Sequence, residues 1–221
     1  MCGRFSNSLT LSEQRRLLQA TGPDLDWAPS WNICPTQQTP VMLGGASGRR
    51  LGLMRWGWNP VPLGGRLLIN ARGEEVHQKP LFRDARERRR CILPASGFYE
   101  WQPATTKQER PQPYAFAQPG TPILAIAGLW EMAPVEDGGK QGRAILLTVP
   151  ANDLVAPIHD RMPLVLGPEA WDQWLDPSLP LEAVMPLIQT SEAVAWRTWK
   201  VDRALSTTSR NGPEAVAPLE A

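Results

Sequence analysis

The stretch Ile123-Leu124-Ala125-Ile126-Ala127-Gly128-Leu129-Trp130 is the longest apolar run of the chain and predicts its fold class. It is far too short to cross a bilayer, which takes about 20 residues as a helix. A short apolar run of this kind is typical of a buried strand. We therefore predict a strand here and no membrane segment.

Other short segments along the chain have strand-like composition. They are residues 41–43, 51–58, 66–69, 91–94, 114–117 and 144–149. The 23 prolines and 18 glycines are spread along the chain rather than gathered in a linker. This spacing predicts many short elements and disfavours a helical bundle.

Helices are expected between these strands. Thr10-Leu11-Ser12-Glu13 has the pattern of a capping box and predicts a helix to about Ala20. Residues 24–38 are predicted to be a loop, and residues 72–90 to be helical in part. Proline at 168 starts a late helix that carries Trp171 and Trp174, and another is expected over 181–188. The fold class is thus α+β, with a curled, mostly antiparallel sheet as a barrel-like core and flanking helices.

Length, charge and cysteine content limit the function classes. The 221 residues fit a single domain over 1–221, with a flexible tail from about residue 213. Lysine plus arginine number 23 and aspartate plus glutamate 22, so overall charge indicates no nucleic-acid partner. Three cysteines without a pairing pattern and no signal peptide predict a cytoplasmic protein. Two histidines and three cysteines lack zinc spacing and no phosphate-binding glycine loop is present, so we expect neither metal nor cofactor.

Cys2 follows only the initiator Met1. Removal of Met1 would leave an α-amine and a thiol on adjacent carbons, a pair that converts an aldehyde into a five-membered thiazolidine ring. The α-amine has a pKa of about 8, so more of it is neutral at pH 7 than of a lysine near 10.4. Alternatively, Cys2 is a buried, inert thiol.

Three polar residues lie in segments that suggest a site. Glu100 lies in Gly97-Phe98-Tyr99-Glu100-Trp101, where burial would raise its pKa, although strand alternation would equally point it to solvent. His159 lies in a proline-bracketed loop and is either a general acid or base or a histidine bonded to backbone. Asn70 ends an apolar strand before Ala71-Arg72, and either orients a ligand or caps the strand.

Basic and aromatic residues alternate in Arg55-Trp56-Gly57-Trp58, and Arg4-Phe5 repeats this near Cys2. Exposed aromatic rings stack on unpaired bases while arginines bind phosphates, which is the usual chemistry of single-strand binding. Most of the ten tryptophans are nevertheless expected in the core.

Together these segments resemble the SOS response-associated peptidase (SRAP) family, whose members crosslink to abasic sites in single-stranded DNA. The resemblance covers nearly the whole chain and is carried by the order and spacing of its motifs. These are Met1-Cys2-Gly3-Arg4-Phe5, Trp31-Asn32-Ile33-Cys34-Pro35-Thr36, Arg55-Trp56-Gly57-Trp58, Ile69-Asn70-Ala71-Arg72, Gly97-Phe98-Tyr99-Glu100-Trp101, Ala127-Gly128-Leu129-Trp130-Glu131 and Ile158-His159-Asp160-Arg161-Met162-Pro163.

The resemblance implies roles for particular residues. Cys2 would be the nucleophile, Asn70 would position its amine and the sugar, and Glu100 and His159 would transfer protons. The residues implied in DNA contact are Arg4, Trp56, Arg72 and Arg161. Cys34 stands where the family usually has alanine, and we interpret it as a small buried hydrophobe.

The function that follows is shielding of abasic sites in single-stranded DNA by a thiazolidine crosslink through Cys2, in the DNA-damage or SOS response. Self-cleavage ahead of Cys2 and weak abasic-site lyase activity are expected with it, in a cytoplasmic monomer that joins the nucleoid when bound to DNA. Two alternatives remain. One is an N-terminal-nucleophile cysteine peptidase or amidase with the α-amine as base. The other is a non-covalent single-strand binding module.

Overall fold

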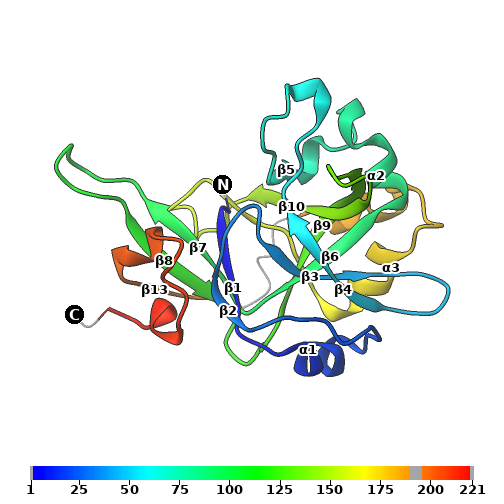
Figure 1. The fold of residues 1–221 in the computed structure, drawn as a ribbon. Helices are drawn as coiled ribbons and strands as arrows, with labels where there is room; N and C mark the ends of the chain where they lie inside the picture. The colour runs from blue at the N-terminus through cyan, green and yellow to red at the C-terminus, as the bar shows by residue number, and fades with distance from the viewer. Residues whose placement is uncertain (1, 190–195, 220–221) are drawn as a thin grey trace.

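The computed structural model describes residues 2–189 and 196–219, and its strands form two sheets. The predicted apolar strand is β9 (Leu124–Pro134), which lies inside the larger sheet. In Figure 1 this larger sheet lies to the right with α2 and α3, and the second sheet lies to the left beside the C-terminal segment. No helix among the described residues is long and apolar enough to cross a membrane.

The larger sheet closes on itself as a five-strand barrel. Each strand pairs with the next in the order β10–β4–β3–β6–β9, and β9 pairs again with β10. All pairings in this ring are antiparallel except that of β10 with β4. The strands are β3 (Gln38–Leu43), β4 (Arg50–Trp56), β6 (Arg90–Ala95), β9 (Leu124–Pro134) and β10 (Lys140–Pro150). The predicted mostly antiparallel, barrel-like core is confirmed.

Gly128 shows why the apolar stretch contains a glycine. A Cβ atom on Gly128 would lie 2.5 Å from Leu93 Cδ1 and 2.6 Å from the Ile145 carbonyl oxygen. Real Cβ atoms do not approach other atoms so closely, so a side chain here would force β6 or β10 away from β9. Glycine at this position allows β9 to pair with both neighbours.

The second sheet has the strand order β13–β8–β7–β1–β2 and brings the two ends of the chain together. Its strands are β1 (Arg4–Asn7), β2 (Ser30–Ile33), β7 (Gly97–Gln102), β8 (Gln112–Ala117) and β13 (Arg197–Lys200). All of its pairings are antiparallel. Phe5 of β1 packs edge-on against Trp56 of β4, with ring centroids 4.9 Å apart, and so joins this sheet to the barrel.

Three short strands extend the barrel sheet. β5 (Asn70–Arg72) and β11 (Arg161–Pro163) pair with the C-terminal half of β10, and β12 (Val165–Leu166) pairs with β9. Thr148 of β10 stands opposite Arg72 on one side and Pro163 on the other. β10 therefore brings the segments around Asn70 and His159 near one another.

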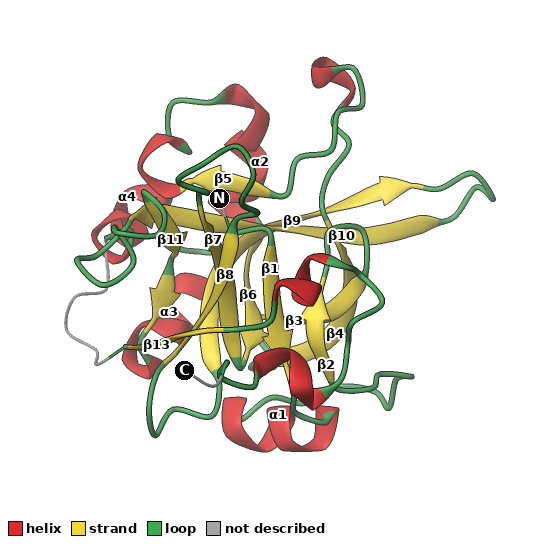
Figure 2. Cartoon of the chain, turned by 90° about the vertical axis from the view of Figure 1, so that its left-hand side faces the viewer, coloured by secondary structure: helices red, strands yellow, loops and turns green. Residues whose placement is uncertain are grey.

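Helices lie around the strands rather than between them (Figure 2). The α-helices are α1 (Leu11–Leu18), α2 (Arg83–Arg88), α3 (Trp171–Leu175) and α4 (Leu181–Val184). The 3-10 turns are η1 (Val61–Leu63), η2 (Gly73–Glu75), η3 (Pro80–Phe82), η4 (Pro168–Ala170), η5 (Met185–Leu187), η6 (Arg203–Ser206) and η7 (Pro213–Val216). The capping box predicted at Thr10 and Glu13 is present.

The local predictions fail at several places. The predicted loop over 24–38 contains β2, whose Asn32 and Ile33 are buried. The predicted strand over 66–69 is reduced to a single bridge between Leu68 and Trp58, and the strand itself begins at Asn70. At the start of the expected tail, residues 213–216 form η7, in which Ala215 is buried. In each case contacts made by segments distant in sequence determine the local conformation.

Candidate functional site at the N-terminal cysteine

Cys2 lies directly before β1 and is completely buried. Its Sγ donates to the Arg4 carbonyl oxygen across 3.7 Å. β1 pairs with β7 so that Arg4 faces Tyr99, and extending this register places Gly3 opposite Glu100. Burial raises the pKa of the Cys2 thiol far above its usual range, and the charge of Glu100 adds to the rise. The thiol is therefore protonated at neutral pH.

Asn70 binds the backbone of Cys2 directly. Its Nδ2 donates to the Cys2 carbonyl oxygen across 2.8 Å, and both residues are buried. β5 holds Asn70 in place, because Asn70 faces Leu146 of β10 and Trp56 Nε1 donates to the preceding carbonyl, that of Ile69, at 3.0 Å. Asn70 Oδ1 is buried and accepts no hydrogen bond from the part of the chain that is described. An acceptor is thus available beside Cys2.

Glu100 is a buried carboxyl on β7, with 3 % of its surface exposed. The alternative of a solvent-facing strand glutamate is therefore wrong. Burial raises the pKa of the Glu100 carboxyl to about 7, and the nearby Asp160 carboxylate also raises it. A carboxyl with this pKa both accepts and donates protons at neutral pH.

His159 lies in the predicted loop, which is bonded to β7 by Gln102 Nε2 donating to the Pro157 carbonyl oxygen at 3.4 Å. Its Nδ1 accepts from the Arg161 backbone N–H at 3.0 Å and lies 2.9 Å from Asp160 Oδ1. Burial lowers the pKa of the imidazole, and Asp160 opposes this.

Arg161 is fastened inside the protein rather than presented to a ligand. Its two terminal nitrogens contact the two carboxylate oxygens of Glu74 at 2.5 and 2.8 Å, and one of them also donates to the Thr148 carbonyl oxygen at 2.7 Å. Only 9 % of its side chain is exposed. The implied DNA contact by Arg161 therefore has no structural support.

The partner of Arg161, Glu74, was not predicted from the sequence. Its only signal was a carboxylate four residues after Asn70.

Trp56 does not offer a stacking surface. Its side chain is fully buried against Phe5, and its indole N–H donates to the Ile69 carbonyl oxygen. Trp58 is buried as well. The expectation that Arg55-Trp56-Gly57-Trp58 forms an exposed basic-aromatic surface is wrong, because the rings fill the core between strands.

The remaining implied contacts differ in exposure. Arg72 is exposed over 56 % of its side chain and pairs with Glu75 at 2.8 Å. Arg4 is half-buried, and its guanidinium donates to groups within the protein. Cys34 is a buried thiol that donates to the Asn32 carbonyl oxygen at 3.2 Å, and burial raises its pKa, as expected for a small hydrophobe.

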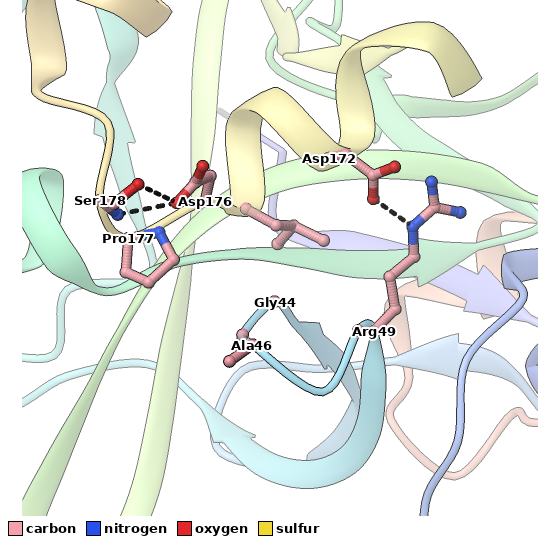
Figure 3. A pocket seen from close by; sticks show the side chains of 10 residues that line it. Gly44, Ala46, Arg49, Asp172, Asp176, Pro177 and Ser178 are labelled. Atoms are coloured by element: carbon pink, nitrogen blue, oxygen red, sulfur yellow. Dashed lines mark hydrogen bonds and ion pairs between the residues drawn. The ribbon is translucent and has the colours of Figure 1, made fainter.

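The polar site around Cys2 does not coincide with the cavity shown in Figure 3. That cavity, of about 630 Å³, lies between the β3–β4 hairpin and the segment after α3. Its charged groups are paired, since Arg49 Nε contacts Asp172 Oδ1 at 2.7 Å and Ser178 donates to Asp176 (Figure 3). The residues that line it are Gly44, Gly45, Ala46, Gly48, Arg49, Asp172, Leu175, Asp176, Pro177 and Ser178.

Fold and site together define a class of α+β proteins in which a closed barrel holds the second residue of the chain against a buried amide and a buried carboxyl. The model of the SOS response associated peptidase (SRAP) family matches residues 1–208, and the chain belongs to this family.

Relatives of this chain carry the name abasic site processing protein. YoqW of Bacillus subtilis (strain 168) is 32% identical over 224 residues, covering 98% of this chain and 99% of the relative. YedK of Escherichia coli (strain K12) is 27% identical over 230 residues, covering 99% and 100%. A solved protein structure from Bacteroides thetaiotaomicron matches with a TM-score of 0.88 at 20% identity, covering 99% of this chain and 100% of that one. This last likeness concerns the fold alone.

Proposed function

We propose that this protein processes abasic sites in DNA by capturing the ring-opened sugar aldehyde on Cys2. The names of the relatives support the substrate class. The observation that carries the proposal is the 2.8 Å hydrogen bond from Asn70 to the Cys2 carbonyl, made in a buried site beside Glu100. An N-terminal residue fixed by a buried amide is suited to a reaction that needs its backbone amine as well as its side chain.

The chemistry takes two steps once Cys2 is the first residue. The α-amine nitrogen attacks the aldehyde carbon, and the carbonyl oxygen leaves as water, which gives an imine. The Cys2 sulfur then bonds to the imine carbon, and the thiol proton passes to the nitrogen, which closes a thiazolidine ring. This order suits a protonated, buried thiol, because the amine and not a thiolate makes the first attack.

Neighbouring groups supply the proton transfers. Glu100, with a pKa raised to about 7 by burial, takes a proton from the α-ammonium and returns it to the departing oxygen. Asn70 Oδ1, which has no donor among the described residues, accepts from the α-amine and directs its lone pair. His159 is the second proton-transfer group, on the loop next to Glu100.

The DNA is expected to be single-stranded and to cross the surface next to Asn70. The segment between β4 and β5 leads directly to Asn70, and within it Val61 is 88% exposed and Leu63 is 46% exposed. Apolar side chains of this kind insert between bases, and the exposed Arg72 is suited to a phosphate. Strand separation would let the flexible sugar reach the buried Cys2.

The direct test is incubation with single-stranded DNA that carries one abasic site, followed by denaturing electrophoresis. Wild type should form a complex that survives boiling, and Cys2→Ala should form none. Cys34→Ala is the matched control, since it removes another buried thiol near the same sheet, and it should react like wild type. Equal crosslinking by Cys2→Ala would overturn the mechanism.

Removal of Met1, which the chemistry requires, concerns a residue outside the described ranges. It would come from ordinary methionine trimming or from self-cleavage, which the family description "peptidase" suggests. A leucine inserted between Met1 and Cys2 blocks ordinary methionine trimming, and protein that retains this leader should not capture DNA, because the Cys2 nitrogen is then an amide. Intact mass of the purified protein reports the state of the terminus, and full capture with a retained leader excludes ring closure.

Lyase activity follows from the imine. Loss of a proton from the carbon next to the imine expels the 3′ phosphate and breaks the strand. Cys2→Ser keeps the amine but removes the thiol that traps the imine. Strand breaks and borohydride-trapped adducts should therefore increase in Cys2→Ser relative to wild type.

A peptidase that acts on other proteins is the competing reading. In it the α-amine would take the proton of the Cys2 thiol, a step that burial makes costly because it raises the pKa of that thiol. Turnover of unrelated peptides in the absence of DNA, lost in Cys2→Ala, would favour this reading.

A further inference from the structure

The guanidinium of Arg4 is fastened inside the protein, two residues after Cys2. One terminal nitrogen donates to Asn32 Oδ1 and to the Leu205 carbonyl oxygen, both at 2.8 Å. The other donates to the Ser206 carbonyl oxygen at 3.1 Å. The same group lies over the ring of Trp101, 5.9 Å from its centroid. One acceptor belongs to β2. The other two belong to η6, which lies about 200 positions later in the sequence.

Asn32 bonds the same distant segment to β2. Its Nδ2 lies within hydrogen-bond distance of the carbonyl oxygens of Leu205, Thr207 and Arg210, at 3.1, 3.1 and 2.8 Å. Asn32 is 1 % exposed, so these bonds are shielded from water. We call residues 203–211 the C-terminal strap.

Asn211 fixes the far end of the strap to β2. Its Oδ1 accepts from Ser30 Oγ, from the Trp31 backbone N–H and from the Asn32 backbone N–H, at 2.9, 2.8 and 3.0 Å. The near end is held by Trp101 Nε1, which donates to Ser206 Oγ at 3.1 Å. The strap is thus bonded to β2, to β7 and to Arg4.

The strap acts on Cys2 through β1. Arg4 is the first residue of β1, and its carbonyl oxygen accepts from the Cys2 thiol. Asn70 donates to the Cys2 carbonyl oxygen. Fixing the Arg4 side chain therefore fixes the backbone that carries the Cys2 amine and thiol, between the barrel and the second sheet.

We propose that Arg4 is a positioning residue, and that the C-terminal strap orients the N-terminal nucleophile through it. The inference rests on the proposed capture of aldehydes by Cys2. This positioning role replaces the DNA contact implied for Arg4. Three N–H groups of its guanidinium already donate to acceptors within the protein. Leu205 and Ser206 contribute backbone carbonyls, so many side chains suit these positions provided that the strap keeps its path.

The two roles of Arg4 predict different measurements. A phosphate contact raises the affinity for DNA, and its loss weakens binding and reduces the salt slope by about one. A positioning residue changes the rate at saturating DNA and leaves affinity alone. A lysine ammonium restores much of a phosphate contact. It cannot reproduce the planar guanidinium that donates to three acceptors at once.

The experiment measures single-turnover capture of abasic single-stranded DNA, and the Kd for intact single-stranded DNA, in Arg4→Ala, Arg4→Lys and Asn211→Ala. Arg16→Ala is the control, since it removes an exposed arginine on α1. All three variants should capture about ten- to a hundredfold more slowly at saturating DNA, because small misplacements of reacting groups cost that much. The Kd should change less than about twofold, and Arg16→Ala should match wild type. Rates are compared at a temperature where thermal melting shows every variant folded.

A second substrate separates this inference from the proposed function. Glycolaldehyde has no phosphate, yet it forms the same ring with an N-terminal cysteine, which intact mass detects. Arg4→Ala and Asn211→Ala should slow this reaction as well. Unchanged glycolaldehyde rates together with a weaker Kd for DNA would make Arg4 a phosphate contact and overturn the inference. Wild type that captures glycolaldehyde but not abasic DNA would instead overturn the proposed function and leave the strap testable.

Discussion

The buried site at Cys2 and the cavity between the β3–β4 hairpin and α3 shift the pKa values of their carboxyl groups in opposite directions. In the cavity, a hydrogen bond from Arg49 lowers the pKa of Asp172, and two hydrogen bonds from Ser178 lower the pKa of Asp176. At Cys2, burial raises the pKa of Glu100 to about 7. The carboxylates that line the cavity therefore stay charged at neutral pH, whereas the Glu100 carboxyl in the buried site gains and loses a proton near neutral pH.

This difference indicates where chemistry is expected. Paired surface charges are solvated and contribute little that a reaction can use. A carboxyl whose pKa lies near the working pH accepts and donates protons with comparable ease. Arg49 and Asp172 line a cavity but form an ion pair, whereas Cys2 and Glu100 combine burial with raised pKa values, a combination typical of reactive sites.

The largest expected effect comes from converting each carboxyl to its amide. Glu100→Gln should slow capture of abasic single-stranded DNA by about a hundredfold, because a general acid–base group typically contributes 10²–10⁴. Asp172→Asn should change the rate less than about twofold, since it loses only a surface pair. Single-turnover kinetics at pH 7 measure both. A comparable loss in the two variants would show that the contrast between the regions has no bearing on the reaction.

The same two carboxyls should respond to pH with opposite signs in stability. Glu100 has an ordinary pKa of 4.5 and a folded value of about 7, so the folded protein binds more protons between these values. Its contribution is fully present below pH 4.5 and is lost as pH rises through 7, by roughly 3 kcal/mol. Glu100→Gln removes this dependence, so its stability relative to wild type should rise between pH 4.5 and 8.

Asp172 reverses that sign. Its pKa is lowered by Arg49, so its contribution is present above its ordinary value of 3.8 and is lost as pH falls. Asp172→Asn should therefore cost most near neutral pH, and only slightly, because the carboxylate is 79% exposed. Urea unfolding of both variants and wild type across this pH range gives the slopes. Parallel slopes for the two variants would contradict the assigned environments.

A smaller effect is expected from the amide that holds Cys2. Asn70→Ala removes the 2.8 Å bond to the Cys2 carbonyl and should slow capture about tenfold through misalignment. Asn70→Asp should be no faster, because a carboxylate cannot donate that bond. Ser178→Ala, which removes the hydroxyl bond to Asp176 in the cavity and keeps the backbone bond, is the matched control and should leave the rate unchanged. Full activity in Asn70→Asp would show that the donor at this position is dispensable.

The sequence allowed much of the barrel to be predicted, because its strands follow from local composition. The runs at 91–94, 123–130 and 144–149 are apolar enough to be buried whatever surrounds them, and they lie in β6, β9 and β10. The second sheet was largely missed. Its β2 and β13 contain polar residues such as Asn32 and Lys200, and they form strands only because distant partners complete their hydrogen bonds.

The sequence predicted which residues form the site but not how their side chains are oriented. The motifs indicated Cys2, Asn70 and Glu100, yet the direction of each side chain depends on register. Trp56 and Arg161 illustrate the limit, since each has the chemistry of a DNA contact and each is used inside the protein. The roles of Glu74 and Asn211 could not be predicted from neighbouring residues, because their partners are 87 and about 180 positions away.

The smallest expected effect tests whether the cavity is independent of the site. Arg49→Gln loses the contact to Asp172, the bond from Arg49 to the Leu18 carbonyl and the stacking on Trp171. The ion pair with the exposed Asp172 and the cation–π contact with the buried Trp171 ring together contribute about 1 kcal/mol, part of which salt screens. Urea unfolding at low and high salt should show this loss, with unchanged capture kinetics. A tenfold slower capture in Arg49→Gln would mean that α3 and the hairpin influence Cys2 through the barrel, and the two regions would then be one coupled site.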